Sequence, residues 1–417
     1  MMKLKSAAHF LSSTLVKIVA GLVVIKVVAW KLGPEGFGLL SQVMTVVAIT
    51  AMLAGAGVTN GLIKVLAGAP ANTVEGKAWV STAFTVTTLA SAIIALLLII
   101  FSEMLANRLL QGHLSSVFLG LALAQSVVAY GNLVQAEASS RGDSAFYAKT
   151  NILGTVLGAG IIAAAVHMSG FEGAAYGVML MPALPGLLGF CYALKKNSEF
   201  FRHLGWSVDK SRIRHLLSFS IVTLIGATSI PIAHLIIRDV VGRQSGWDQV
   251  GLWQGAVKIS DVYMQFVGVV LVNYALPRCA AATNLDRAVV ELKTTLLWLL
   301  LAISAGLLLL YLIRNIVIEL VFSKDFLPMS DFFAAQFIGD IFRTVAASIS
   351  FMFMARGIIR VSMMFELLQG VFLVVAFMLL ANVAGRLAPV YAHVMTYGVL
   401  AIMMSLGLMA WVKRNQR

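Results

Sequence analysis

Four polar side chains recur at helical spacing inside a hydrophobic stretch at residues 249–273. This first polar stripe consists of Gln254, Lys258, Asp261 and Gln265. Spacings of four, three and four positions place the side chains on one face of an α-helix. A charge near the middle of a bilayer costs about 3 kcal/mol or more, so it faces protein or water rather than lipid. We therefore expect the stripe to line a hydrated interior.

A second polar stripe lies in the hydrophobic stretch at residues 332–355 and consists of Gln336, Asp340 and Arg343. Its spacing repeats that of the first three residues of the first stripe, with the two charges in the opposite order. If the two helices are neighbours, Lys258 can pair with Asp340. In the same way, Asp261 can pair with Arg343. Two interpretations stay open: the pairs fix helix packing, or they line a path and exchange partners as it opens. Asp261 and Asp340 are also candidates to carry a proton.

The first predicted span carries two lysines, Lys17 and Lys26, without an acidic residue in the same span. They are nine residues apart, about half a turn out of phase, so both can face one narrow cavity only if the helix bends, for example near Gly21. Lys26 is close enough to the outer end of the span to snorkel, whereas Lys17 lies nearer the middle. Within the spans, four bases outnumber two deep acids, which favours an anionic substrate.

Three amides share a face of the predicted span at 116–138, namely Gln125, Asn132 and Gln135, and could hydrogen-bond sugars. Two tryptophans, Trp247 and Trp253, lie near the start of the span at 249–273. Indole rings are enriched where a membrane meets water, so we interpret both as interface anchors.

The composition places the chain among membrane proteins. It has 417 residues, of which 60% are hydrophobic and 12% charged, whereas soluble proteins carry about 25% charged residues. Apolar runs of about 20 residues, each able to cross about 30 Å of hydrocarbon, recur from end to end. The N-terminus lacks a small-residue cleavage site and is expected to be a retained helix. The two cysteines, Cys191 and Cys279, are expected to stay reduced.

The predicted fold is an all-α polytopic membrane protein with twelve transmembrane helices in two six-helix bundles around a central cavity. The expected domains are an N-terminal bundle at 1–194, a basic cytoplasmic linker at 195–212 and a C-terminal bundle at 213–417. The linker composition suits either a segment on an anionic membrane surface or an ordinary basic loop. The spans are expected at 8–30, 37–61, 78–101, 116–138, 146–167, 173–194, 213–238, 249–273, 291–313, 332–355, 362–384 and 389–411.

The distribution of basic residues predicts the orientation. Of the 31 Lys and Arg residues, 20 fall on the side of the N-terminus and seven on the opposite side. Because cytoplasmic loops are rich in Lys and Arg, both termini are expected in the cytoplasm. The net charge of +13 has the same explanation, so no nucleic-acid partner is expected.

The two halves show a faint internal similarity. Glu35, Gly38 and Leu39 recur 213 positions later as Asp248, Gly251 and Leu252. Halves of six spans keep the same orientation in the membrane and would be related by an axis along the membrane normal, with a substrate path between them.

Several function classes lack their motifs. The sequence contains no phosphate-binding G-x-x-x-x-G-K-[ST] loop, no metal-ligand spacing and no nucleophile motif, so neither enzymatic activity nor a cofactor is expected. A membrane polymerase or ligase should also carry a substantial outer loop, which the predicted topology lacks. A multidrug efflux antiporter of the same fold remains an alternative, although it would favour an acid-rich cavity.

Five strings resemble Wzx-type lipid-linked oligosaccharide flippases, which include those for O-antigen and enterobacterial common antigen repeat units. The strings are STLVKIVAGL (13–22), GPEGFGLLSQ (33–42), LAGAGVTNG (53–61), GFEGAAYG (170–177) and WDQVGLWQGAVKISDVYMQF (247–266). The resemblance implies the fold of the multidrug/oligosaccharidyl-lipid/polysaccharide (MOP) exporters with alternating access. It also implies transport of an undecaprenyl-pyrophosphate-linked oligosaccharide across the bacterial inner membrane. The implied partners are this glycolipid, membrane lipids, and the polymerase and chain-length regulator of the pathway, with the flippase acting as a monomer.

In such flippases, basic cavity residues are thought to meet the pyrophosphate. Lys17 and Lys258 lie within the matching strings and Lys26 lies just outside the first one, whereas Asp340 and Arg343 rest on the spacing argument alone. The complete set of expected substrate-binding residues is Lys17, Lys26, Lys258, Asp261, Asp340, Arg343, Gln254 and Gln336.

Overall fold

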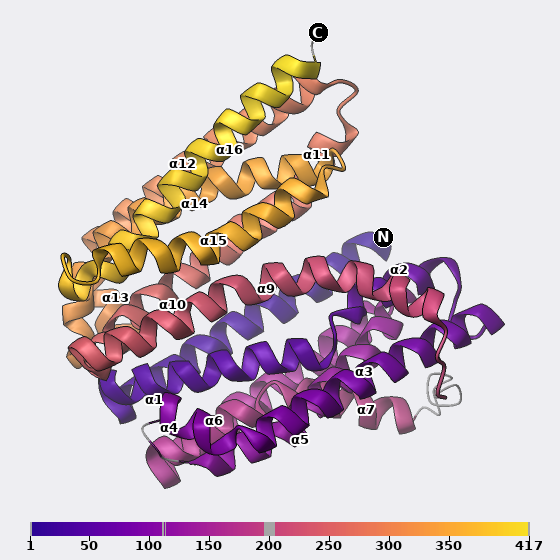
Figure 1. Ribbon diagram of the computed structural model, residues 1–417, viewed down its shortest axis with the longest axis horizontal. Helices are drawn as coiled ribbons and strands as arrows, with labels where there is room; N and C mark the ends of the chain where they lie inside the picture. Colours follow the sequence, from indigo (N-terminus) through magenta and orange to yellow (C-terminus); the bar gives the residue numbers. More distant parts are fainter. Residues whose placement is uncertain (1, 111, 113, 196–204, 416–417) are drawn as a thin grey trace. The chain divides into compact units, whose positions relative to one another are not determined.

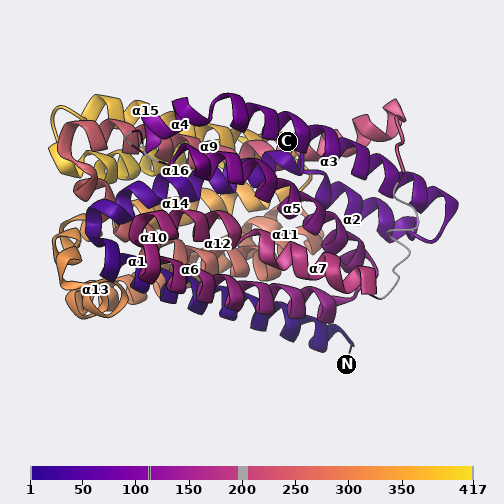
Figure 2. The same ribbon diagram turned by 90° about the horizontal axis from the view of Figure 1, so that it is seen from below.

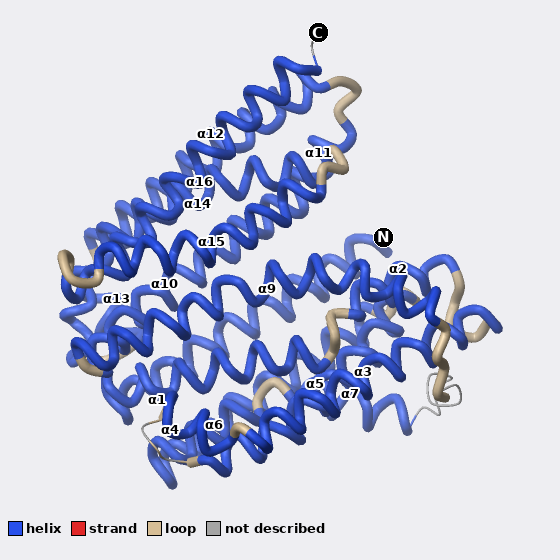
Figure 3. The backbone as a smooth tube through the Cα atoms, in the orientation of Figure 1, coloured by secondary structure: helices blue, strands red, loops and turns tan. Residues whose placement is uncertain are grey.

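A computed structural model describes residues 2–110, 112, 114–195 and 205–415 of the chain (Figure 1). The described residues form helices joined by short loops, and no strand occurs among them (Figure 3). Nine described helices are long and apolar enough to cross a membrane. Each predicted span coincides with helix over most of its length. The predicted all-α polytopic fold is therefore confirmed.

Two long helices each hold more than one predicted span, and a glycine interrupts each of these helices. α1 (Met2–Ala54) is broken at Gly33, whose φ of 64° lies in the left-handed region, and Pro34 follows. Proline is tolerated at the start of a helix because it lacks only an N–H that would be unpaired there. α6 (Ser144–Leu180) is broken at Gly170, with φ 54° and ψ −128°. These positions separate spans one and two and spans five and six.

Side-chain caps fix the starts of several helices at the predicted membrane boundaries. Thr73 accepts a hydrogen bond from the Gly76 amide at the start of α3 (Val74–Ile100). Asp143 caps α6 in the same way. Asn284 caps α12 (Leu285–Leu312). Each cap supplies an acceptor for an N–H that lacks a partner within its helix.

The chain divides into two compact units. The first comprises residues up to Leu32 together with Leu39–Leu224. Its central helix is α5 (Ser115–Ser140), which packs against α3 and α6 (Figure 2). α5 also packs against α2 (Val58–Gly68), α4 (Ser102–Leu109) and α7 (Ala183–Lys195).

The second unit comprises Gly33–Gly38 and Ile225–Arg417. α9 (Lys210–Ser245) therefore begins in the first unit and ends in the second. The central helix of the second unit is α14 (Ser330–Ala355), which packs against α10, α12, α15 and α16. The remaining elements are α10 (Trp247–Val270), η1 (Leu271–Ala275), α11 (Leu276–Ala281), α13 (Arg314–Val321), η2 (Lys324–Met329), α15 (Ile359–Leu380), η3 (Gly385–Leu387) and α16 (Ala388–Asn415).

The same pairs of spans pack together in both units. Spans four and six meet as α5 and α7 in the first unit, and spans ten and twelve meet as α14 and α16 in the second. At the first crossing Gly131 lies against Gly186, backbone to backbone. At the second crossing Gly339 lies against the ring of His393 instead. The repeat in helix packing supports the internal duplication predicted from the sequence.

The short segment Gly33–Gly38 packs against α10 within the second unit. A Cβ at Gly251 would overlap the carbonyl of Pro34, and a Cβ at Gly38 would overlap the carbonyl of Trp247. Phe37 is 2% exposed and makes edge-to-face contacts with Phe322 and Phe326 at centroid distances of 5.7 and 5.6 Å. The segment is thus held by close backbone contact and by buried aromatic area.

Half of the predicted linker at 195–212, namely residues 196–204, lies outside the described residues. The described residues that follow residue 204 contact α3. The Ser207 amide donates to the Thr85 hydroxyl at 3.0 Å, and the rings of Trp206 and Phe84 are 6.3 Å apart.

Candidate functional site

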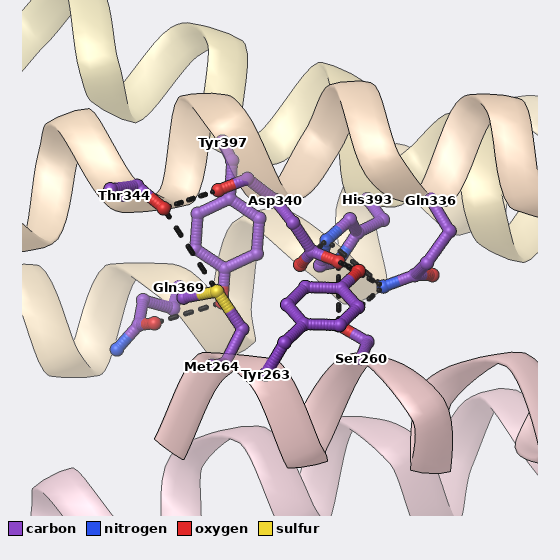
Figure 4. Close-up of polar contacts among 9 residues, drawn as sticks. All are labelled: Ser260, Tyr263, Met264, Gln336, Asp340, Thr344, Gln369, His393 and Tyr397. Carbon is purple, nitrogen blue, oxygen red and sulfur yellow. Dashed lines mark hydrogen bonds and ion pairs between the residues drawn. The ribbon is translucent and has the colours of Figure 1, made fainter. Parts of the chain in front are cut away.

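The second unit contains a buried polar cluster centred on Asp340, which is fully buried on α14. The hydroxyls of Ser260 and Tyr263 on α10 and the side-chain amide of Gln336 donate to Oδ2 of Asp340 (Figure 4). Nε2 of His393 on α16 lies 3.0 Å from Oδ1. A carboxylate only accepts hydrogen bonds, so the cluster satisfies an ionised Asp340 on both oxygens.

α10 and α14 are neighbours, which is the condition set for the predicted charge pairs, but the pairs themselves are wrong. Lys258 pairs with Asp261 on its own helix, with Nζ and Oδ2 3.5 Å apart. Asp340 pairs with His393 instead of Lys258. The physical reason is helix rotation: α10 presents Ser260 to α14, and this position is about 100° around the helix from Asp261.

The predicted Asp261–Arg343 pair is also absent from the ion pairs of the described residues. The guanidinium of Arg343 lies over the ring of Tyr397, 5.5 Å from its centroid. The Tyr397 hydroxyl donates to Oε1 of Gln369 at 2.9 Å. The amide of Gln369 in turn donates to Glu366. The polar network therefore extends from α14 through α16 to α15.

A small cavity of about 40 Å³ adjoins the Asp340 cluster. Its polar lining comes from His234, Ser260, Asp261, Gln336, Arg343, His393 and Tyr397. A cavity needs about 10–15 Å³ to hold one water molecule, so this one has room for water but not for a sugar ring.

The first stripe is divided between two environments. Gln254 is 1% exposed, whereas the Asp261 side chain is 45% exposed and Gln265 is exposed. The interpretation of the two tryptophans as interface anchors is wrong, because Trp247 and Trp253 are 7% and 2% exposed. The Trp253 ring packs against His234 at 5.3 Å, so its indole belongs to the core of the second unit.

In the first unit, Lys17 is exposed and its Nζ lies 5.7 Å from the centroid of the Tyr147 ring. Lys26 is half-buried. The backbone of α1 stays helical through Gly21, and its non-helical residue is Gly33. A bend that would turn both lysines toward one cavity is therefore not found at Gly21.

The three amides of α5 differ in accessibility. Gln125 is fully buried, and its amide donates to the Ser91 and Ala122 carbonyls. Gln135 accepts from Asn151 at 3.1 Å. Asn132 lines a cavity of about 340 Å³ whose lining also includes Thr59 and Asn60. This cavity is large enough for part of a polar ligand.

Several polar residues of the cluster are missing from the sequence-based selection. His393 is the only His, Lys, Arg, Asp or Glu in the predicted span at 389–411, and this is the signal that could have identified it. Tyr263 lies two positions from Asp261 in the first stripe, and no separate signal marks it. Arg238 of α9, also missing from that selection, is 3% exposed. Among the described residues no group of three His, Cys, Asp or Glu side chains could hold a metal ion. Cys191 and Cys279 are both free cysteines.

Comparison with solved structures shows the fold. An inward-facing multidrug resistance MATE family transporter of the MOP superfamily matches with a TM-score of 0.75 at 17% identity, over 96% of both chains. Lipid II flippase MurJ in an inward closed conformation matches with a TM-score of 0.73 at 15% identity, over 95% of this chain and 86% of that one.

Comparison with known sequences shows the family. A family profile described as polysaccharide biosynthesis protein matches residues 27–331. The Lipid III flippase of Escherichia coli (strain K12) is 30% identical over 398 residues, which cover 94% of this chain and 95% of the relative. The Lipid III flippase of Shigella flexneri matches to the same extent. These relatives confirm the resemblance found in the five sequence strings. The chain therefore belongs to the polysaccharide biosynthesis protein family and has the fold of the MOP superfamily.

Proposed function

We propose that this protein is a flippase that moves undecaprenyl-pyrophosphate-linked oligosaccharides from the cytoplasmic to the periplasmic leaflet of the bacterial inner membrane. It would serve the biosynthesis of O-antigen or enterobacterial common antigen and catalyse no covalent chemistry. The observation that carries the proposal is the 30% identity to the E. coli Lipid III flippase over 94% of the chain. The expected bundles at 1–194 and 213–417 would alternate access by rocking.

The substrate carries a pyrophosphate, and exposed lysines supply the charge to bind it. Lys17 is the best candidate, because the residue is exposed and its ammonium lies beside the Tyr147 ring. A lysine binds phosphate as a point charge with three donors. Lys26 and Lys258 are half-buried and would add to the positive field.

The cavity beside Asn132 would contact the glycan, because its Thr59 and Asn60 side chains offer donors and acceptors. The acidic and amide members of the expected set have a different role. Asp340, Gln336 and Gln254 are almost fully buried, so we do not expect them to contact the substrate.

The alternative of a multidrug antiporter draws on the likeness to MATE transporters. That likeness is at 17% identity and supports the fold alone. The two relatives named Lipid III flippase are 30% identical to this chain, and the match covers 95% of their length. The excess of basic residues also favours an anionic substrate.

Complementation tests the proposal. The chain is expressed in flippase-null strains that differ in their surface glycan, and glycan display is measured together with drug resistance. At least one strain should regain its glycan without gaining resistance. If the cells gain drug resistance and no strain regains glycan display, the antiporter function would be established instead.

The role of Lys17 is tested in the strain that responds. Lys17→Ala should lower the rate of glycan display about tenfold or more, because a hydrogen bond to a charged group is worth about 1.5–3 kcal/mol. Lys17→Arg should retain most of the rate. The matched control is Lys149→Ala, which removes an exposed lysine of α6 two positions from Tyr147 and should leave display unchanged. Equal rates for Lys17→Ala and the parent chain would exclude the pyrophosphate contact.

A further inference from the structure

The second unit holds a buried acid–base pair to which substrate binding assigns no role. Nε2 of His393 and Oδ1 of Asp340 are 3.0 Å apart, and their side chains are 10% and 0% exposed. Because a carboxylate only accepts, Nε2 carries the hydrogen and the other ring nitrogen is the one that gains or loses a proton. Together the two side chains form a site for one exchangeable proton.

The helix crossing that carries this pair is adapted to hold an imidazole. At the corresponding crossing of the first unit, Gly131 meets Gly186 and the helices are in backbone contact. Where α14 crosses α16 in the second unit, the ring of His393 lies against Gly339, and a Cβ at Gly339 would overlap its Cδ2. The glycine on α14 therefore makes room for the ring one residue from Asp340.

Charged and titratable groups on α9, α10, α14, α15 and α16 surround the pair, and the formal charges of the whole group balance. The cations are Arg238 of α9, Lys258 of α10 and Arg343 of α14, and the carboxylates are Asp340, Asp261 of α10 and Glu366 of α15. The remaining groups are His234 of α9, Tyr263 of α10 and Tyr397 of α16. Three cations face three carboxylates, so loading one proton changes the local formal charge only from zero to plus one.

We infer that Asp340 and His393 form the proton-binding site through which this protein couples proton movement to transport. In the loading step a hydronium ion gives its proton to His393 and becomes water, and the neutral imidazole becomes imidazolium beside the Asp340 carboxylate. Release is the reverse, and no electron is transferred. The coupling rests on the proposed function of glycolipid transport. Proton binding by Asp340 and His393 does not depend on that function.

The ligand geometry favours a proton over a sodium ion. A hard cation needs several free oxygen ligands, but the hydroxyls of Ser260 and Tyr263 and the Gln336 amide already occupy Oδ2 of Asp340. The other oxygen faces the His393 ring nitrogen. A sodium ion would have to displace donors from both oxygens, whereas a proton requires none of them to move.

Water can reach the pair through the adjoining cavity. The cavity of about 40 Å³ is lined by His393 and by Asp261, whose side chain is 45% exposed. This volume exceeds the about 10–15 Å³ that one water needs. Gln336 lines the same cavity, and its Oε1 is buried without a hydrogen-bond partner among the described residues. A water in the cavity would meet this acceptor and could carry the proton inward from Asp261.

The coupling test uses the purified full-length protein in liposomes with a lipid-linked oligosaccharide that the wild type transports. A difference of about one pH unit across the membrane should shift the leaflet ratio of the glycolipid about tenfold if one proton moves per substrate. Asp340→Asn and His393→Gln should abolish this shift. The matched control, His167→Gln, removes an exposed imidazole of α6 and should keep it. A tenfold shift that survives in His393→Gln, or a shift driven by sodium at equal pH, would overturn the proposal.

A second readout needs no substrate. Infrared difference spectra of the protein between two pH values should contain carboxylate and imidazole bands that disappear in Asp340→Asn and His393→Gln and persist in His167→Gln. Absence of such bands from the wild type would refute the proton site even if glycolipid moves. Their presence in a protein that moves no glycolipid would keep the proton site and refute the proposed function. For a variant that transports no glycolipid, the same spectra show whether the variant has lost the proton site.

Discussion

Asp340 accepts hydrogen bonds from three different helices, and its neutral replacement should reveal what its charge contributes. Three donors converge on Oδ2, while His393 lies beside Oδ1. Asparagine has the same shape but presents an amide N–H in place of one acceptor. We therefore expect Asp340→Asn to lower the free energy of unfolding by about 1–3 kcal/mol.

The measurement is the unfolding midpoint of the purified protein in detergent, with Asp261→Asn as the matched control. Asp261 is 45% exposed and 3.5 Å from Lys258, and exposed ion pairs contribute at most about 1 kcal/mol. Similar midpoints for both variants would show that the buried cluster does not need an ionised Asp340.

Gly339 should be as important for the acid–base pair as the two titrating residues themselves. Gly339→Ala adds a methyl group where the His393 ring lies, so the imidazole must move away from Asp340. The pH-driven shift in leaflet ratio should fall as in His393→Gln. Gly398→Ala on α16 is the control, because a Cβ there meets Phe342 at an ordinary 3.7 Å. An unchanged shift in Gly339→Ala would mean that the pair tolerates a displaced ring.

The sequence predicts which residues belong together at the site better than it predicts their contacts. The two stripes lie on helices that pack together in the structure, but the rotation of α10 decides that Ser260 rather than Lys258 meets Asp340. His393 is distant along the chain, and its proximity depends on the packing of α16 against α14. Neither rotation nor packing partner follows from periodicity alone.

Among the elements, the contact between α10 and the Gly33–Gly38 segment should be the least tolerant of added volume. Gly251→Ala places a methyl group against the Pro34 carbonyl, and overpacking costs typically about 1–3 kcal/mol. The unfolding midpoint should drop accordingly. Gly268→Ala on the same helix is the control, because a Cβ there meets nothing within 4 Å. If both alanines have equal effects, helix propensity and not the close contact explains them.

The element boundaries follow closely from local signals. Gly33 and Pro34 mark the break in α1, and the Asp143 cap starts α6 where the predicted loop ends. The similarity of residues 35–39 to 248–252 identifies two segments of equal topological position. Gly38 and Gly251 also lie close to each other's segments. The repeat alone does not predict this tertiary contact.

At the scale of the whole molecule, the two cysteines offer a test of orientation. Cys191 is exposed near the end of α7, whereas Cys279 is buried. If both termini are cytoplasmic, a membrane-impermeant maleimide should label the chain in inside-out vesicles but not in intact spheroplasts. Cys191→Ser should abolish the labelling and Cys279→Ser should preserve it. Labelling of intact spheroplasts through Cys191 would reverse the predicted topology.

The segment Gly33–Gly38 also limits how such a protein can be recombined. Its residues are encoded with the first bundle but pack within the second unit. A hybrid gene that joins the first half of one relative to the second half of another therefore brings together a Phe37 and a Phe322–Phe326 pair that never evolved as neighbours. Transplanting residues 33–38 together with the second half should restore the match. A simple crossover near residue 200, made to exchange glycan specificity between relatives, would therefore mismatch this short segment with the second unit.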